Sequence, residues 1–197
     1  MIIREMNAND LDAVVSVHQD AFEGFFLTRM GPRFLRAYYN TVLDFGGRIA
    51  IIGQDPNSRA VLGFAVGFQG PQGFYQLFGQ RRKRMIPTVM LAVLRDPGLV
   101  PQIIRNMRRV ENQVQQSNDA VELSSIAVGS SGRGVGGALL SAFMGKVREE
   151  GAHRVVLTTD AQGNDLVRKF YEARGFTLDG IETRGARRLC RYVRELR

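Results

Sequence analysis

The sequence lacks the features that mark secreted, membrane-spanning or metal-binding proteins. It contains a single cysteine, Cys190, so no internal disulfide can form, which is typical of a reducing cytoplasm. Its longest apolar runs, such as residues 49–52, fall far short of the roughly 20 residues that a membrane span needs, and no basic segment followed by an apolar one predicts a secretory signal. His18 and His153 have no cysteine or carboxylate cluster at ligand spacing. We therefore predict a cytoplasmic protein without a metal site.

Composition and charge favour one globular domain over residues 1–197. The chain is 44% hydrophobic and 23% charged, and a chain of this length buries roughly 70% of its unfolded surface. Lysine and arginine number 27 against 19 acidic residues, and they gather in segments 81–84, 105–109 and 184–197. Such an excess favours a polyanion, an anionic substrate, an acidic membrane face or simply a solvated surface. Because these runs lack interleaved aromatic residues, we expect no nucleic-acid partner.

The pattern along the chain predicts a mixed α+β order without internal repeats. Strands are expected over residues 1–6, 48–53, 60–68, 121–128 and 154–159, with two more between 176 and 196. One helix is expected to begin at residue 11, and a helical region over 22–45 is broken at Gly31-Pro32. Further helices are expected over 84–95, over 99–114, after the strand at 121–128 as far as about residue 150, and over 164–174. The turn at Asp55–Ser58 predicts an antiparallel hairpin between the second and third strands.

The most informative stretch, residues 122–140, is an apolar strand that runs through a glycine-rich turn into a helix. The turn contains Gly132, Gly134, Gly136 and Gly137. Without side chains, backbone N–H groups can close on an anion, and the helix dipole favours phosphate there. The G-x-G-x-x-G spacing alone also admits a dinucleotide site. However, only 60 residues follow Gly137, too few for the rest of a Rossmann sheet, and no Gly-Lys-Ser/Thr of a Walker A site follows.

A second motif lies downstream, where Tyr171 follows Asn164 by seven residues and Gly175-Phe176 comes next. With the preceding strand and turn, this combination resembles the GNAT N-acetyltransferase superfamily, which transfers an acyl group from acyl-coenzyme A to an amine. The positions that carry the resemblance are Ile126, Ala127, Val128, Gly134, Gly136, Asn164, Tyr171, Gly175 and Phe176. The resemblance covers residues 121–176. It implies the α+β GNAT fold, a mostly antiparallel twisted sheet of about six or seven strands, flanked by helices, with its fourth and fifth strands splayed apart.

The resemblance implies acetyl-CoA as the donor co-substrate. Strand backbone is then expected to bind the pantetheine arm and the acetyl carbonyl, and the N–H groups of the turn to hold the pyrophosphate. The implied cofactor-binding positions are Ile126, Ala127, Val128, Ser131, Gly132, Arg133, Gly134, Val135, Gly136, Gly137 and Asn164. Ser131 departs from the glutamine or arginine of the family pattern, although its hydroxyl can still donate and Arg133 supplies a nearby positive charge.

Two side chains are implied to act on protons. An acceptor amine with a pKa near 10.4 costs roughly 5 kcal/mol to deprotonate at pH 7, so a general base is needed. Glu122, six residues before Val128, matches the catalytic glutamate of the histone-acetylating branch, and Asp160 is a second candidate. Tyr171 is expected to donate a proton to the departing thiolate, whose reference pKa is about 8.5. An exposed carboxylate at Glu122 and a core tyrosine at Tyr171 are the competing structural interpretations.

The acceptor is predicted less directly, from the first helices and a basic helical insertion at about residues 74–117. Arg29, Arg33 and Arg36 lie three or four residues apart, which predicts one basic stripe beside an aromatic one. The segment resembles bacterial acetyltransferases of surface-polysaccharide pathways, which implies a small-molecule amine acceptor, either an amino sugar or an anionic nucleotide-linked amino sugar. A solvated helix face is the alternative interpretation of this stripe.

The insertion and the function class each leave alternatives open. The insertion is expected to form a packed subdomain or a homodimer contact, and its apolar faces with flanking arginines also suit a peripheral membrane contact. The chain could act without catalysis, as an acyl-CoA-binding module or a polyanion-binding protein. As an enzyme, it could instead acetylate protein N-termini, lysines or polyamines.

Overall fold

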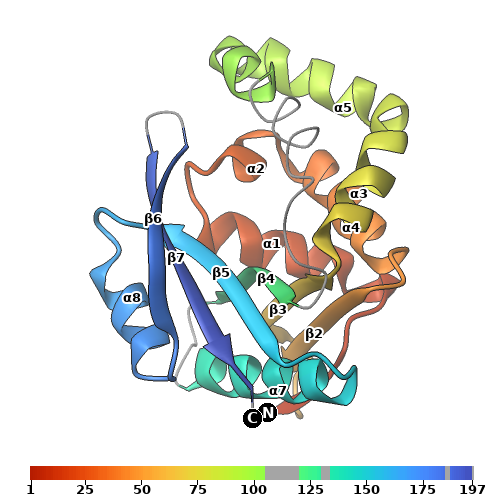
Figure 1. The fold of residues 1–197 in the computed structure, drawn as a ribbon. Helices are drawn as coiled ribbons and strands as arrows, with labels where there is room; N and C mark the ends of the chain where they lie inside the picture. Colours follow the sequence, from red (N-terminus) through yellow and green to blue (C-terminus); the bar gives the residue numbers. More distant parts are fainter. Residues whose placement is uncertain (105–119, 130–133, 185–186, 197) are drawn as a thin grey trace.

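A computed structural model describes residues 1–104, 120–129, 134–184 and 187–196 (Figure 1). Within them, seven strands form one sheet: β1 (Ile2–Glu5), β2 (Arg48–Gln54), β3 (Val61–Gln69), β4 (Ala120–Val128), β5 (Arg154–Asp160), β6 (Thr177–Arg184) and β7 (Arg187–Glu195). The α-helices are α1 (Leu11–Ala21), α2 (Phe26–Arg29), α3 (Pro32–Leu43), α4 (Pro71–Gln80), α5 (Arg82–Arg95), α7 (Val135–Glu149) and α8 (Asp165–Glu172). Short 3₁₀ turns, η1 (Ala8–Asp10) and η2 (Pro97–Leu99), precede α1 and follow α5.

The strands follow the order β1-β2-β3-β4-β5-β7-β6. Every neighbouring pair is antiparallel except β4 and β5, which run parallel. Parallel neighbours need a crossover, which α7 supplies between β4 and β5. This mixed, mostly antiparallel sheet confirms the predicted α+β fold class.

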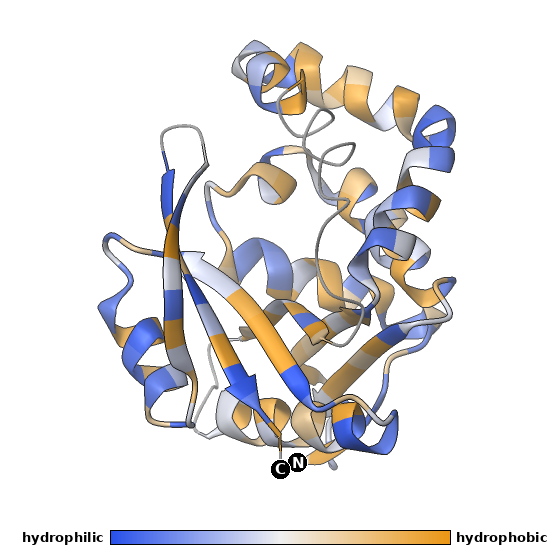
Figure 2. Ribbon diagram, in the orientation of Figure 1, coloured by the Kyte–Doolittle hydropathy of each residue, from blue (hydrophilic) through white to orange (hydrophobic). Residues whose placement is uncertain are grey.

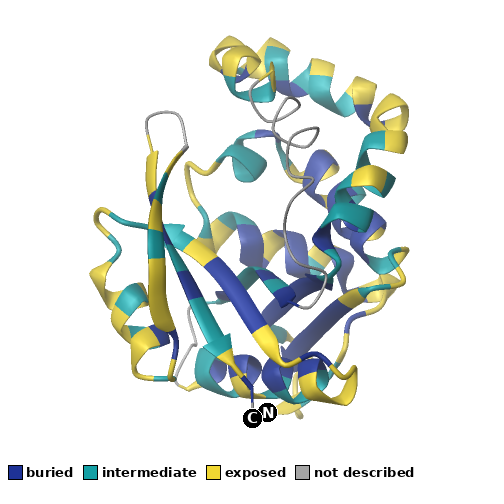
Figure 3. Ribbon diagram, viewed as in Figure 1, coloured by how far each residue is buried: buried dark blue, intermediate teal, exposed yellow. Residues whose placement is uncertain are grey.

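Helices cover both faces of the sheet and create two separate cores (Figures 2 and 3). On one face, α7 packs against β2, β3 and β4, and its apolar stripe joins Tyr171 of α8 in the first core. On the other face, α1 packs against β3 and β4, and α3 packs against β2. The second core there includes Leu35, Tyr39 and Phe64, which are fully buried.

Local sequence signals explain where the first helices begin. The side chain of Asn7 accepts a hydrogen bond from the N–H of Asn9, and the carboxylate of Asp10 accepts one from the N–H of Asn7 (2.8 Å), so a capping box starts the first helical turn. Gly31 takes a positive φ of 88°, and Pro32 then occupies the first position of α3. The predicted break at Gly31-Pro32 is confirmed.

The segment predicted as a helical insertion begins earlier than expected. The sequence pattern did not predict α4, which starts at Pro71 after Gly70 in the left-handed region, because Gly73 and Gly79 weaken its helical pattern. The predicted helix over 84–95 is confirmed within α5. Residues 100–104 are helical, as expected for the start of the predicted helix at 99–114, whose remainder lies outside the described residues.

α5 joins the rest of the molecule through a third, smaller core. Met85 and Ala92 of α5 are buried there against Met30 and Phe34, together with Leu99 of η2. In Figure 1, α5 lies at the end of the molecule opposite α7. None of the helices in the described part of the chain is long and apolar enough to span a bilayer.

Candidate active site

The sheet opens between β4 and β5. Their parallel pairing is confined to Ala120, Val121 and Glu122 of β4, opposite residues 154–156 of β5. Beyond Glu122, β4 stays paired with β3 and β5 stays paired with β7, while the two strands diverge (Figure 1). Within the residues that the structure describes, no strand pairs with the β5-facing edge of β4 over 123–128. The predicted splay of these two strands is confirmed.

A β-bulge marks the point of divergence. Gly67 of β3 pairs with Leu123 and Val66 pairs with Ser125, so Ser124 is the extra residue on β4. A side chain at Gly67 would overlap the ring of Phe143 and the carbonyl oxygen of Glu122, so the close approach at this point requires glycine. At the bulge, Ser124 and Ser125 both approach α3, where they interact with Tyr38 and Tyr39 respectively.

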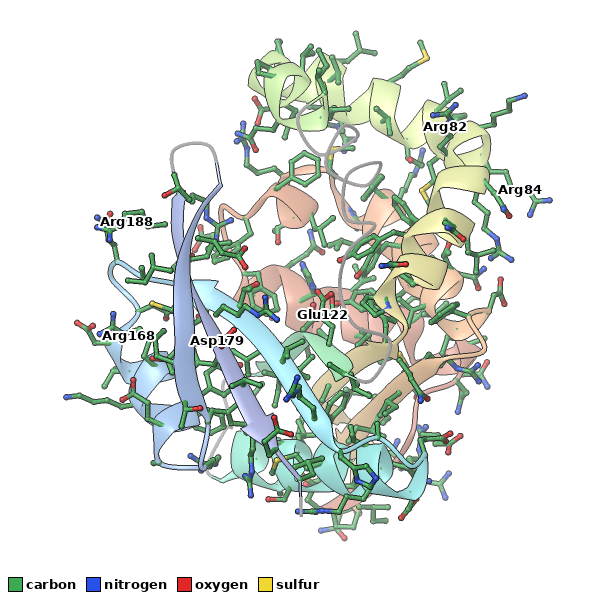
Figure 4. The ribbon with its side chains drawn as sticks, in the orientation of Figure 1. Arg82, Arg84, Glu122, Arg168, Asp179 and Arg188 are labelled. Carbon is green, nitrogen blue, oxygen red and sulfur yellow. The ribbon has the colours of Figure 1, made fainter. Side chains whose placement is uncertain are left out.

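Glu122 lies at the centre of the molecule (Figure 4). Its side chain is half-buried, and the hydroxyl of Tyr75 on α4 donates a long hydrogen bond of 3.5 Å to its Oε1. The Tyr38 hydroxyl lies 3.4 Å from Ser124 Oγ. Burial, reinforced by the charge of Glu122 and opposed by the Ser124 hydrogen bond, raises the pKa of Tyr38 to about 12. The carboxylate is therefore held in a polar cluster rather than exposed at a strand end.

His18 lies behind this cluster as a neutral core residue. It is 3% exposed, and its Nδ1 lies 2.7 Å from the hydroxyl of Tyr39. Burial lowers the pKa of His18 to about 4, so the imidazole is uncharged at neutral pH. Its Nε2 has no hydrogen-bond partner among the described residues. Across those residues, no group of three histidine, cysteine or acidic side chains is arranged to hold a metal ion.

The first turn of α7 lies on the opposite face of the sheet. Gly134 precedes the helix with a φ of +78°, and Val135, Gly136 and Gly137 form its first turn. The N–H groups of a first helical turn have no partner within the helix, which leaves them available to an anion. The predicted positions Ser131, Gly132 and Arg133 lie outside the described residues.

Arg174 adds a cation to this helix start, a residue that the sequence motifs did not indicate. Its guanidinium carbon lies 3.8 Å from the centre of the Phe170 ring, and its Nη1 donates a 2.9 Å hydrogen bond to the Phe170 carbonyl. A Cβ at Gly137 would lie only 2.9 Å from Arg174 Nη2. The charge is thus placed against α7 by packing between α7 and α8. Its only signal in the sequence is its position just before Gly175-Phe176.

Asn164 and Tyr171 occupy the two ends of α8. Asn164 precedes the helix and donates a 2.6 Å hydrogen bond to Thr159 at the end of β5. Tyr171 is 6% exposed and packs against the rings of Phe176 and Tyr192. Burial raises the pKa of Tyr171 to about 12. Its hydroxyl makes no hydrogen bond to any residue that the structure describes. Tyr171 therefore belongs to the α7 side of the sheet, and Glu122 to the α1–α3 side.

Several charged residues with expected roles form ion pairs with other elements. Asp160, the second candidate base, accepts hydrogen bonds from Arg187 through both carboxylate oxygens, at 2.9 and 2.6 Å. Asp160 is therefore engaged in an ion pair at the end of β5. Arg187 is the first residue of β7 and also lies 4.9 Å from the centre of the Phe25 ring. It therefore links the start of β7 to the connection between α1 and α2.

The three arginines of the predicted basic stripe lie on two helices. Arg29 ends α2, where its Nε donates a 2.9 Å hydrogen bond to Asp96, whereas Arg33 and Arg36 belong to α3. Arg36 pairs in turn with Asp12 of α1. The break at Gly31-Pro32 puts Arg29 on a different helix from Arg33 and Arg36, so the helical periodicity on which the prediction depended does not continue across it.

Comparisons with known proteins bear on the fold and the chemistry. Residues 102–176 match the model of the acetyltransferase (GNAT) family. No curated protein matches the chain. The ribosomal-protein-alanine N-acetyltransferase from Brucella melitensis superposes with a TM-score of 0.65 at 16% identity, covering 100% of both chains. The aminoglycoside 6'-acetyltransferase type Ii gives 0.62 at 15% identity, covering 99% of this chain and 97% of that one.

A third neighbour was solved with coenzyme A. The PaiA N-acetyltransferase from Thermoplasma acidophilum, in complex with coenzyme A, superposes with a TM-score of 0.59 at 12% identity, covering 96% of each chain. Neighbours this distant establish the GNAT fold for the chain. The family model adds a similarity to GNAT acetyltransferases over residues 102–176.

Proposed function

We propose that this chain is an N-acetyltransferase that moves an acetyl group from acetyl-CoA to a primary amine by direct attack. One observation carries the proposal. β4 and β5 stop pairing after Glu122, so a carboxylate lies where the two strands diverge, and the glycine-rich start of α7 lies on the other face of the sheet. Such an arrangement suits a reaction in which a phosphorylated donor and an amine approach one strand from opposite sides.

The residues around the opening fit acetyl-CoA. The unpaired edge of β4 over Ile126, Ala127 and Val128 offers backbone groups to an extended pantetheine arm. The first turn of α7 and the nearby guanidinium of Arg174 fit a pyrophosphate. We assign Arg174 part of the charge that the family pattern places at the position of Ser131. When bound, acetyl-CoA supplies a thioester-activated acetyl group.

Glu122 is proposed as the general base that takes a proton from the acceptor amine. The carboxylate is half-buried beside the hydroxyls of Tyr38 and Tyr75, on the face of the sheet away from α7. An amine that reaches it there stands next to the edge of β4. The reaction needs a group that takes up the ammonium proton, because a lysine-like amine is almost fully protonated at pH 7.

Tyr171 is proposed as a hydrogen-bond donor to the leaving thiolate. A pKa of about 12 keeps its hydroxyl protonated at neutral pH. Complete transfer of that proton to a thiolate with a reference pKa of about 8.5 would be uphill by roughly 5 kcal/mol. Hydrogen-bond donation carries no such penalty. The role expected from the sequence therefore narrows from proton transfer to stabilisation of the leaving group.

The acceptor that we propose is an amino sugar or a nucleotide-linked amino sugar. Its support is the resemblance of residues 25–39 to surface-polysaccharide acetyltransferases and the structural similarity to an aminoglycoside 6'-acetyltransferase. A protein N-terminus is the second candidate, supported by the ribosomal-protein neighbour of similar TM-score. A cytoplasmic location is proposed with it, from the single cysteine.

Two measurements on the full chain test this function. Acetyl-CoA should raise the thermal unfolding midpoint, and thiol release should then be followed against amino sugars, nucleotide-linked amino sugars, polyamines and peptides with free N-termini. Turnover with an amino sugar that falls sharply in Glu122→Gln is the expected result. Stabilisation by acetyl-CoA without turnover of any amine would instead indicate a non-catalytic acyl-CoA-binding module, and absence of stabilisation would overturn the proposal.

A further inference from the structure

α5 has apolar side chains on two opposite sides. Met85 and Ala92 face inward and are buried in the third core. Ile86, Met90 and Leu94 remain 51%, 60% and 78% exposed. Residues four apart in an α-helix lie about 40° from one another around its axis, so these three form one outward row. We call Ile86, Met90 and Leu94 the outer row of α5.

The outer row places three exposed apolar side chains next to one another on one side of α5. Single exposed apolar residues are normal on protein surfaces, whereas aligned ones mark a contact site. Exposed apolar side chains continue along the sequence at Val100 and Ile104, which are 40% and 47% exposed. Figures 2 and 3 show that hydrophobic positions and exposed positions both recur along α5.

Positive charges flank the outer row at both ends. Arg82, Lys83 and Arg84 precede it, Arg95 follows it, and the sequence of α5 contains no acidic residue. All four cations are exposed, and the described residues supply none of them with an ion-pair partner. Arg82 and Arg84 point away from the body of the molecule in Figure 4. The pattern is an apolar strip bounded by uncompensated cations.

This charge pattern selects among the surfaces that could cover the outer row. A two-fold contact between copies of α5 would bring the same cations together, with no carboxylate on the helix to offset them. An anionic bilayer matches both the flanking cations and the apolar outer row. Its headgroups attract lysine and arginine, and the boundary between headgroups and acyl chains accepts apolar side chains. The net charge of +8 favours the same partner.

We propose that α5 is an interfacial helix that docks the protein on an anionic lipid surface. Ile86, Met90 and Leu94 enter the boundary between headgroups and acyl chains, and the flanking cations contact the headgroups. Because α5 lies at the opposite end of the molecule from α7 (Figure 1), docking leaves the glycine-rich start of α7 uncovered. This inference is independent of acetyl transfer and would hold for a protein with another activity.

Co-sedimentation of the full chain with vesicles tests the docking. The wild type should sediment with vesicles of phosphatidylcholine and phosphatidylglycerol in equal parts, remain in solution with phosphatidylcholine alone, and be released by high salt. Replacing both Arg82 and Arg84 with glutamine should lower the bound fraction several-fold. Replacing Lys169 and Arg188, which are exposed cations elsewhere, removes the same charge and should lower it far less.

A matched pair of substitutions tests the apolar part. Ile86 on α5 and Ile181 on β6 are both 51% exposed, so Ile86→Asp and Ile181→Asp make the same chemical change in equally exposed positions. Ile86→Asp should reduce vesicle binding about tenfold or more, and Ile181→Asp should leave it near the wild-type level. Ile86→Gln adds no charge and should still weaken binding. Unchanged thermal unfolding midpoints show that the variants are folded.

Three results would overturn the proposal. The first is a wild type that fails to bind anionic vesicles at low salt. The second is an equal loss of binding in Ile86→Asp and Ile181→Asp. The third is a wild-type dimer, measured by analytical ultracentrifugation, that Ile86→Asp converts to a monomer without any vesicle binding, which would make the outer row a self-association surface. Thiol release in solution by Ile86→Asp reports on the proposed enzyme activity separately.

Discussion

The two faces of β4 differ in how they present chemistry. Toward α7, the strand presents apolar side chains such as Leu123, Ile126 and Val128 to the first core. Toward α1 and α3 it presents Glu122 and Ser124 to tyrosine hydroxyls. The first face offers a ligand backbone groups and a glycine-rich helix start, and the second offers ionisable side chains. This difference separates, in the proposed reaction, the binding of the donor from the activation of the acceptor.

Glu122→Gln is the substitution with the largest expected effect on the proposed reaction, and it tests this separation directly. A general base contributes roughly 10²- to 10⁴-fold to the rate, so kcat/KM for the best amine should fall within that range at neutral pH. The defect should shrink at high pH, where more of the amine is already neutral. Thermal stabilisation by acetyl-CoA should be unchanged, because Glu122 belongs to the face away from α7. A variant that loses acetyl-CoA binding together with turnover would contradict the division of roles.

The second test concerns His18, the buried histidine on the α1–α3 side of the sheet, and the pH dependence of stability that it causes. The folded pKa of His18 is about 4, below its usual 6.5, so the unfolded chain binds a proton more readily between these values. The free energy of unfolding therefore has its full value, as far as His18 is concerned, above pH 6.5. It falls by about 3 kcal/mol as the pH drops from 6.5 toward 4. Urea unfolding over this range measures it. His18→Gln should flatten the slope, and a flattening of equal size in His153→Gln would contradict this assignment.

The sequence predicted much of the fold because its signals are local. Residues 121–128, the glycine-rich turn and the following helix form one continuous pattern, and the splay of β4 from β5 followed from the family resemblance. α4 was missed because Gly73 and Gly79 interrupt its helical periodicity, while its actual start depends on the left-handed Gly70. Its helical state also depends on packing against α3 and α5, which the local sequence does not encode.

The candidate site divides in the same way. The backbone positions of the donor side lie within one motif, so the sequence could indicate them. Arg174 reaches Gly137, and Tyr75 reaches Glu122, only through packing between elements distant in the chain. The ion pair of Asp160 with Arg187 spans 27 residues and likewise has no local signature. Contacts of this kind decide which carboxylate forms an ion pair, and they appear only in the folded chain.

Tyr171→Phe tests the face of β4 toward α7, where acetyl-CoA is proposed to bind, and its expected effect is smaller. A hydrogen bond to a charged group contributes about 1.5–3 kcal/mol, so kcat should fall by roughly tenfold to a hundredfold, with the KM for acetyl-CoA nearly unchanged. Stability should change little, because the Tyr171 hydroxyl bonds to no residue in the described part of the chain and the ring stays packed. Unchanged turnover with intact cofactor binding would remove Tyr171 from the reaction. Glu122→Gln made in this background should add its full defect, because the two residues act from opposite faces.

The smallest effect, and the most selective one, comes from two glycines of the same helix. Gly145 of α7 faces open space, so Gly145→Ala should raise the free energy of unfolding by about 0.5–1 kcal/mol and leave the KM for acetyl-CoA unchanged. Gly137→Ala gains the same helix propensity, but its methyl group would lie 2.9 Å from Arg174 Nη2 and must displace the guanidinium. The KM for acetyl-CoA should then rise by roughly a factor of ten or less, the value of a weakened hydrogen bond. Equal KM values in the two variants would remove Arg174 from the donor side, because displacing its guanidinium would then have no effect on cofactor binding.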